Sequence, residues 1–243
     1  LQSAVKNKIK EWFTDGLKPW DISRDKPYFG FMIPGYEDKY FYVWLDAPIG
    51  YIASLENYLK RVNSPKNSED LWGKDSNAEI YHFIGKDIMN FHTLFWPCLL
   101  EAGGFKRPTN VFVHGFMTLN GKKMSKSKKN FLLVDDYLEI MKPDLIRYYL
   151  ASKLSAGVDD LDMDFKDFQK KVNTDLVGKF INIASRSQGF LKKDNNKIGD
   201  ELDETIINEF VEQKDVIFNL YVDREYSKAC LLYTSDAADE GLG

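Results

Sequence analysis

The strongest constraint on the fold is a change in hydrophobic pattern about two-thirds of the way along this 243-residue chain. Before the change, short runs of aromatic and β-branched residues alternate with longer stretches that have helical spacing. Strands are predicted at residues 29–33, 40–45, 79–84 and 111–113, and helices at 46–61 and 87–103. Alternating strands and helices predict an α/β fold, with a parallel sheet covered by helices.

After the change the pattern is helical. From residue 165, apolar residues recur at helical spacing, at Phe168, Val172, Leu176, Phe180 and Ile183. This period predicts one long helix to about residue 190, with further helices at 144–153 and 200–220. The acidic stretch 159–164 is expected to form a turn, which places a domain boundary near Asp164.

The composition predicts a soluble globular protein. The net charge is −4, so any site for anions has to be local. The sequence contains no run of eighteen apolar residues and no signal peptide. Cys98 and Cys230 have no paired spacing, which argues against a disulfide framework or a zinc knuckle here and favours a reducing cytoplasm.

One loop concentrates positive charge. Residues 121–130 read GKKMSKSKKN, five lysines in ten residues. The loop follows a predicted strand, and α/β proteins bind ligands beyond the carboxyl ends of strands, here marked by Leu45, Gly85 and His114. Because lysine binds phosphate oxygens as a point charge, the loop is predicted to hold a phosphate; the alternative is a solvated face, the usual role of a charge run.

Several catalytic motifs are excluded. Five residues rather than four lie between Gly115 and Gly121, and no Ser or Thr follows Gly121-Lys122, so the loop is not a Walker loop. Neither Gly-x-Ser-x-Gly nor His-Glu-x-x-His occurs, which leaves serine-hydrolase and zincin chemistry without their motifs.

The residues Lys123-Met124-Ser125-Lys126-Ser127 are identical to the KMSKS signature of class I aminoacyl-tRNA synthetases. Three further blocks narrow the resemblance: DISRDKPYFG at 21–30, WLDAPIGY at 44–51, and YHFIGKDI at 81–88 followed by His92. Together they resemble the methionyl-tRNA synthetases from about residue 12 to 190. Leucine, isoleucine and valine enzymes share the lysine signature, but the second and third blocks argue against them.

The resemblance implies the second half of a Rossmann-like parallel-sheet catalytic domain, followed by an all-α anticodon-binding helical bundle that is cut short. The implied segments are the end of an inserted connective domain (1–20), the catalytic half with the KMSKS loop (21–142), a connecting stem-contact segment (143–164), the start of the helical domain (165–229) and a doubtful non-native tail (230–243).

The implied function is that of a methionine–tRNA ligase, which activates L-methionine with ATP and Mg²⁺ and transfers it to tRNA(Met) for protein biosynthesis. The first step needs no general base, because the attacking carboxylate is already ionised at neutral pH. Catalysis then rests on positioning and on stabilising charge at the phosphates. The resemblance implies a cytoplasmic enzyme, and it places any homodimer contact beyond residue 243.

Residues for ATP follow from the matched motifs. The resemblance assigns Lys126, Lys123 and Arg24 to the reacting phosphates. ATP-contacting positions are Gly85, Asp87, His114, Met117, Lys123, Ser125 and Lys126. Glycine admits close approach of the nucleotide and a carboxylate accepts from ribose hydroxyls, although Asp87 can also simply cap the helix that follows it. Lys128 and Lys129 lie outside the signature and are expected to be solvated or to help tRNA approach.

A methionine pocket is predicted from helical spacing. Ala47 and Tyr51 are i and i+4 on one helix, and Ile88 and His92 have the same spacing on another. In the family these positions line the amino-acid pocket, together with Trp44 and Pro48. A thioether suits an aromatic cage, whereas the alternative for each aromatic residue alone is an ordinary core position.

The helical part carries a candidate tRNA contact. Asn182 and Arg186 are i and i+4, and they resemble residues that read the CAU anticodon. Unpaired bases are recognised by stacking and by hydrogen bonds to their edges, for which Asn and Arg are suited. The alternative is an exposed amphipathic face.

Parts of the family pattern are absent from the sequence. The His-Ile-Gly-His-type motif and the acidic group for the methionine ammonium are missing, and so is most of the inserted domain, to which the resemblance assigns any zinc. The fragment alone is therefore expected to be inactive, and a non-catalytic tRNA-binding module stays open as an alternative. Residues 230–240, CLLYTSDAADE, resemble a translated sequencing adapter.

Overall fold

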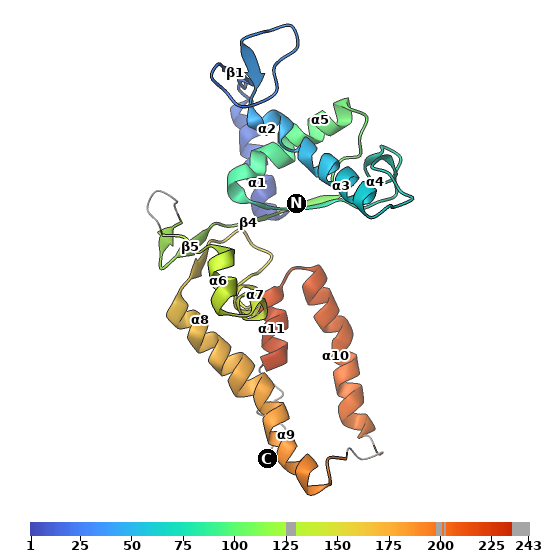
Figure 1. Ribbon diagram of the computed structural model, residues 1–243, viewed down its shortest axis with the longest axis vertical. Coiled ribbons are helices and arrows are strands. Elements are labelled where there is room, and N and C mark those ends of the chain that lie inside the picture. The colour runs from blue at the N-terminus through green and yellow to red at the C-terminus, as the bar shows by residue number, and fades with distance from the viewer. Residues whose placement is uncertain (125–129, 198–200, 202, 235–243) are drawn as a thin grey trace. The chain divides into compact units, whose positions relative to one another are not determined.

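The structure is a computed structural model that describes residues 1–124, 130–197, 201 and 203–234. It divides into two compact units, Leu1–His114 and Gly115–Gly243, which are described separately (Figure 1). Both contain helices and small sheets, in agreement with the predicted α/β class. The finer domain limits drawn from the family resemblance stay predictions.

The first unit places short helices around two small sheets. Its elements are α1 (Ser3–Asp15), β1 (Ser23–Asp25), β2 (Lys39–Phe41), α2 (Val43–Asp46), α3 (Ile49–Arg61), α4 (Glu69–Trp72), β3 (Tyr81–Gly85), the 3₁₀ helix η1 (Lys86–Ile88), the π-helix η2 (Phe91–Phe95), α5 (Trp96–Ala102) and β4 (Asn110–His114). The α5 helix and α4 share a buried core of Trp72, Trp96 and Leu100.

The strands β3 and β4 are parallel, as the sequence pattern predicted. Their register pairs Tyr81 with Asn110 and Gly85 with His114, so the two predicted strand ends lie side by side. Side chains alternate across the sheet, and one face is buried: His82, Ile84, Val111 and Val113. Ligand-binding positions are expected at this shared carboxyl end.

The predicted strand at 29–33 is wrong. Within it only Met32 forms an isolated bridge, to Tyr40, after the chain turns back at Gly35, whose φ of 82° is left-handed. The predicted strand at 40–45 is too long: β2 ends at Phe41 and pairs antiparallel with β1. Leu45 therefore lies in the short helix α2 and does not mark a strand end.

Asp46 does not cap the helix that the sequence predicts at 46–61. It is itself helical in α2, and Pro48 stands at the N-cap of α3 without a side-chain capping hydrogen bond. The carboxylate oxygen Oδ1 of Asp46 is buried and has no hydrogen-bond partner among the described residues.

The helix predicted at 87–103 is confirmed in extent, but it changes pitch along its length. It begins with η1, widens to the π-helix η2, and continues as α5 until the two glycines Gly103 and Gly104 end it. Pro97, which has no backbone N–H, follows directly after the widened segment. Asp87 makes no capping hydrogen bond at the start of η1.

The second unit combines a three-stranded sheet with long helices. Its elements are β5 (Met117–Leu119), β6 (Lys122–Lys123), α6 (Val134–Ile140), α7 (Pro143–Ala151), β7 (Leu161–Met163), α8 (Phe165–Lys171), the π-helix η3 (Val172–Ile181), α9 (Asn182–Lys193), α10 (Glu204–Val222) and α11 (Tyr226–Thr234). The β5 strand pairs antiparallel with β6 and parallel with β7.

The sheet of the second unit was not foreseen from the sequence. The stretch 159–164, predicted as a turn, contains β7, because Leu161 and Met163 pair with β5 and Met163 is buried in the core. That core also holds Tyr137, Tyr149 and Phe168.

The long helix predicted from residue 165 is confirmed, and it runs to Lys193 through a π-helical middle. It begins at Asp164, whose side chain accepts a hydrogen bond from the N–H of Asp167 at 2.8 Å.

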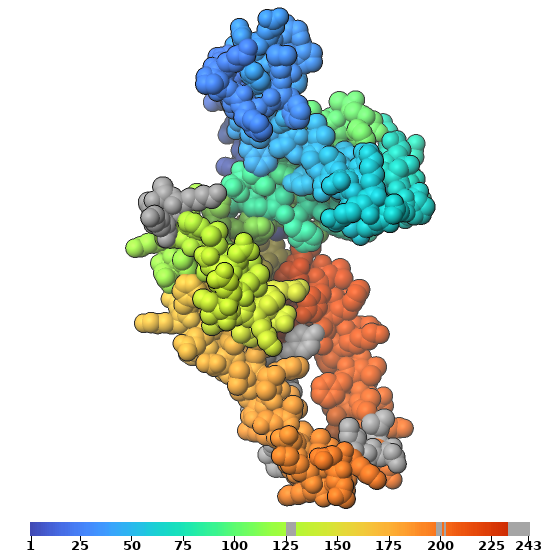
Figure 2. Space-filling view, in the orientation of Figure 1, coloured from blue at the N-terminus to red at the C-terminus, as the bar shows by residue number. Residues whose placement is uncertain are grey.

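Figure 2 shows open space between α9 and α10. No helix in the described part of the chain combines the length and the apolar content that a membrane span requires.

Candidate functional site

A hydrogen-bonded pair of predicted site residues lies at the centre of the first unit. The hydroxyl of Tyr51 on α3 lies 2.8 Å from Nε2 of His92, which is fully buried in η2. On the other side of the ring, Nδ1 lies 3.0 Å from the carbonyl oxygen of Ile88. A carbonyl oxygen only accepts, so Nδ1 carries the proton; in the neutral ring Nε2 then accepts from the Tyr51 hydroxyl.

Trp44 joins this pair from α2. Its ring stacks on Phe91 at 4.7 Å with an interplanar angle of 6°, and it meets His92 edge-on at 6.2 Å. The π-helix η2 presents Phe91 and His92 together, and π-helical turns occur often at functional sites. Burial raises the pKa of Tyr51, which keeps its hydroxyl protonated and able to donate.

Ala47 and Pro48 influence the position of Tyr51 through their backbone in this structure. They form the turn between α2 and α3, where Pro48 is buried and Ala47 is exposed. The N–H of Tyr51 donates to the carbonyl oxygen of Pro48 at 3.1 Å, so the turn sets where Tyr51 stands. The structure thus brings Trp44, Tyr51 and His92 into contact.

Behind this pair lies a second layer that the sequence analysis missed. His82 on β3 is buried, and its Nε2 accepts a hydrogen bond from Nε1 of Trp96 at 3.2 Å. The ring centroid of His82 lies 5.0 Å from that of Tyr51 and 5.6 Å from that of His92. The signal was present, because His82 occupies the inward position of an alternating strand, where a polar residue is unusual.

Gly85 and Asp87 lie together at the end of β3. A methyl group added to Gly85 would lie 2.6 Å from Oδ1 of Asp87, so the carboxylate folds back over the glycine. Gly85 is also paired with His114, the last residue of β4. These three predicted nucleotide contacts are therefore neighbours.

Arg24 lies beside the aromatic group rather than within it. Its guanidinium carbon is 3.9 Å above the ring of Tyr42, and Nη1 donates to the carbonyl oxygen of Ser23 at 2.7 Å. Tyr42 contacts Trp20 edge-on at 5.8 Å, and Trp20 packs on Phe95 of the π-helix at 4.1 Å. Aromatic rings thus connect Arg24 to the helix that carries His92.

The lysine signature of the second unit starts on a tight hairpin. Asn120 and Gly121 join β5 to β6 with φ values of 51° and 71°, the two positive values that a type I′ turn requires. Lys123 ends β6, and its ammonium lies 4.8 Å from the ring centroid of Phe116. Met117 begins β5. Ser125 and Lys126 lie outside the described residues.

Asp162 of β7 fixes this hairpin. Its Oδ1 accepts from the hydroxyl of Thr118 at 2.6 Å and from the N–H of Gly121 at 2.7 Å. These hydrogen bonds lower the pKa of Asp162, with the bond from Thr118 as the largest cause. Next to it, the side-chain amide of Asn130 donates to the carbonyl oxygen of Lys123 at 3.0 Å and closes the neck of the loop.

The predicted anticodon residues share one helical face. Asn182 is the first residue of α9, and Arg186 lies one turn later on the same helix, where it is exposed. This geometry matches the predicted spacing.

Comparison with known proteins decides the family. Residues 1–188 match the family model for class I tRNA synthetases (M). The chain belongs to this family. As a class I synthetase it is also similar to solved structures of methionyl-tRNA synthetase from Mycobacterium tuberculosis.

Two of these solved structures are described as holding methionyl-adenylate. Both are 26% identical to this class I synthetase chain, with TM-scores of 0.71 and 0.72. A ligand-free structure of the same enzyme is 23% identical, with a TM-score of 0.66, and shows the fold alone. The first two comparisons cover 96% of this chain but only 46% of the solved one, so the chain spans less than half the length of these relatives.

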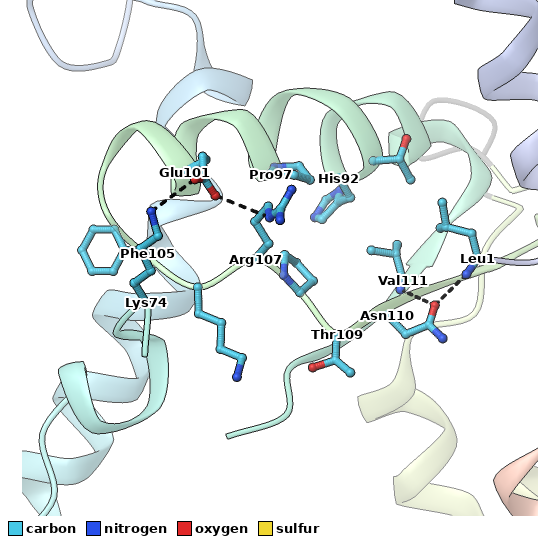
Figure 3. A pocket seen from close by; sticks show the side chains of 13 residues that line it. Leu1, Lys74, His92, Pro97, Glu101, Phe105, Arg107, Thr109, Asn110 and Val111 are labelled. Atoms are coloured by element: carbon cyan, nitrogen blue, oxygen red, sulfur yellow. Dashed lines mark hydrogen bonds and ion pairs between the residues drawn. The ribbon is translucent and has the colours of Figure 1, made fainter. Parts of the chain in front are cut away.

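In the described part of this class I synthetase chain, two pockets border the candidate group, and each is lined by one member of the group formed by Trp44, Tyr51 and His92. A pocket of about 530 Å³ lies between α5 and β4, and of the candidate residues only His92 lines it. Figure 3 shows Glu101 at its rim, paired with Lys74 and Arg107. A second pocket of about 470 Å³ borders Tyr51. The hydrogen bond between Tyr51 and His92 defines the candidate site more specifically than either pocket does.

The described ranges contain no cluster of three or more His, Cys, Asp or Glu side chains placed to hold a metal ion.

Proposed function

We propose that this chain is part of a methionine–tRNA ligase, which forms methionyl-adenylate from L-methionine and ATP and passes the methionyl group to tRNA(Met) in the cytoplasm. The observation that carries the proposal is the Tyr51–His92 pair beside Trp44, in a family with solved relatives described as holding methionyl-adenylate. We propose the finer fold as well: the second half of a Rossmann-like domain, then a truncated anticodon-binding bundle.

The amino-acid side chain would be held by the aromatic group. Sulfur–aromatic contacts contribute about 0.3–1.5 kcal/mol each, so the rings of Trp44, Tyr51 and His92 together favour a thioether. Ile88, Ala47 and Pro48 complete this proposed pocket. A leucine or valine side chain would lose the sulfur contacts, which makes the aromatic group a means of selection.

The nucleotide would bind at the shared end of β3 and β4. Asp87 would accept from ribose hydroxyls, Gly85 would leave room for the sugar, and His114 and Met117 would contact the base; the proximity of Asp87 and His114 to Gly85 supports this proposal. Lys123, Ser125 and Lys126, with Arg24, would face the phosphates. Mg²⁺ is held mostly by substrate phosphates in such enzymes, so it would enter with ATP.

The tRNA would contact the helical part of the second unit. Asn182 and Arg186 lie one turn apart on α9, and an exposed arginine can both stack on a base and donate to its edge.

The test is restoration of activity by the missing half. We expect the chain alone to give no methionine-dependent ATP–pyrophosphate exchange, because the other wall of the ATP site is absent. Extending the chain upstream with its own first half of the catalytic domain, hereafter the completed enzyme, is expected to restore exchange with methionine and not with leucine, isoleucine or valine.

Two outcomes would contradict the proposal. Exchange by the chain alone would show that it needs no second half. A completed enzyme that binds tRNA with a steep salt dependence, but neither binds ATP nor supports exchange, would instead be a tRNA-binding module.

A second prediction concerns Gly85→Ala. The added methyl would displace the Asp87 carboxylate, so we expect ATP binding to the completed enzyme to weaken about tenfold, the scale of one lost hydrogen bond to a charged group. Stability should change little, because only a side-chain end has to move. Gly189→Ala is the matched control, since its methyl meets nothing within 4 Å. Equal ATP affinity of Gly85→Ala and wild type would refute the ribose role of Asp87.

A further inference from the structure

His82 is the residue of the first unit whose chemistry the proposed function leaves unexplained. It is 7% exposed and lies on β3 behind the Tyr51–His92 pair, with four aromatic neighbours: Tyr51, Trp72, His92 and Trp96. Burying a polar ring is unfavourable unless it makes hydrogen bonds, whereas a phenylalanine would fill a similar volume without that penalty. A buried imidazole nitrogen at position 82 therefore requires a hydrogen-bond partner.

The partner of this nitrogen is the indole of Trp96. Nε1 of Trp96 donates to Nε2 of His82 at 3.2 Å, and Trp96 is 2% exposed. Burial, with a smaller contribution from the nearby His92, lowers the pKa of His82 to about 4. The ring is thus neutral at physiological pH, and its Nε2 remains an acceptor for the indole.

Tyr51 depends on these two rings for its direction. It is 40% exposed and contacts the rings of His82 at 5.0 Å, His92 at 5.8 Å and Trp96 at 6.3 Å. Two of those three contacts are the members of the His82–Trp96 hydrogen bond. If that bond is lost, the indole N–H loses its acceptor inside the core, the packing of the two rings shifts, and the phenol loses the surfaces that aim its hydroxyl at His92.

We infer that His82 is a positioning residue: by holding the indole of Trp96 it aims the Tyr51 hydroxyl at His92 and so shapes the pocket for the amino-acid side chain. This inference rests on the proposed function for the identity of the ligand. The positioning itself is a property of the chain as it stands and can be measured without catalysis.

The first measurement is the ¹⁵N spectrum of the imidazoles. The chain has three histidines, so single variants of His82 and His114 assign all the signals. In the wild type we expect His92 to show one protonated and one unprotonated nitrogen, the pattern of a fixed Nδ1–H ring. His82→Phe, which keeps an aromatic ring and removes the acceptor, is expected to average that pattern. His82→Gln, which keeps an acceptor for the indole, should restore it in part.

The second measurement is kinetic. In the completed enzyme, His82→Phe is expected to raise KM for methionine about tenfold, the scale of one buried hydrogen bond, with kcat changing less than about twofold. His82→Gln should lie closer to the wild type. A residue that only fills the core would lower the urea midpoint without this split between KM and kcat.

The outcomes separate the two proposals. If His82→Phe leaves the His92 signals and KM as in the wild type, or if Phe and Gln act alike, His82 is not a positioning residue. If the wild-type completed enzyme shows no exchange, the proposed function fails, while the ¹⁵N spectra still decide whether His82 orients the Tyr51–His92 pair.

Discussion

Replacing Lys126 with alanine in the completed enzyme is expected to lower methionine-dependent ATP–pyrophosphate exchange by about a hundred- to a thousand-fold. The reaction needs no general base, so its barrier is lowered mainly by positioning and by positive charge at the phosphates. An ammonium that meets charge developing in the transition state affects kcat more than binding of ATP.

The described part of the loop supports such a role without placing Lys126 itself. The hairpin that leads into the signature is pinned at its turn by Asp162, and the loop is closed at its neck by Asn130. The described residues on either side of the signature are thus held by hydrogen bonds, which supports a defined contact between the signature and phosphate.

The matched control is Lys128→Ala, which removes the same charge two residues later in the same loop. We expect it to change exchange less than about threefold, because only bulk attraction for ATP is lost. The measurement is the rate of pyrophosphate exchange at saturating methionine. Equal losses of this rate in the two variants would show that the loop acts through net charge. No loss in Lys126→Ala would remove the phosphate role.

Local patterns predicted the elements that carry the site, and the pairings between elements were harder to foresee. Helical spacing predicted that Tyr51 and His92 lie on the pocket-facing sides of their helices, and in the structure a hydrogen bond joins them. The sequence pattern did not reveal the contact of Trp96 with His82, since those residues meet only once β3 is covered by the following helix. The strand predicted at residues 40–45 was too long because a run of aromatic residues is compatible with both a strand and the helix α2.

The hairpin follows from a local signal. Asn120-Gly121 stands between short runs, and Asn-Gly in that setting is the strongest short hairpin signal. The β7 strand had no such signal, because its three residues Leu161–Met163 become a strand only by pairing with β5.

Gly115→Ala is expected to destabilise the second unit by about 3 kcal/mol or more. An added methyl would lie 2.1 Å from the carbonyl oxygen of Asp159 and 2.6 Å from the backbone nitrogen of Asp160. Backbone atoms cannot swing aside as a side chain does, so the two segments must separate. The hydrogen bonds next to this contact, from Phe116 N–H to the Asp160 carboxylate and from Leu161 N–H to the Phe116 carbonyl, would then be lost.

The chain offers a direct way to see this effect. All five tryptophans, at 12, 20, 44, 72 and 96, precede Gly115, so their fluorescence reports the first unit, whereas far-UV circular dichroism also reports the helices of the second. We expect Gly115→Ala to lower the urea midpoint seen by circular dichroism more than the midpoint seen by fluorescence. Gly189→Ala, whose methyl meets open space on α9, should leave both unchanged.

The consequence reaches the proposed chemistry, because Gly115 packs against the start of the segment that pairs β7 with β5, and β5 carries the hairpin of the lysine signature. A completed enzyme that carries Gly115→Ala should therefore lose exchange activity when its second unit unfolds. Part of that activity should return when removal of urea or a lower temperature refolds the unit. An unchanged circular dichroism midpoint would mean that the backbone relaxes around the methyl, and that close packing at Gly115 does not hold the strands of this sheet together.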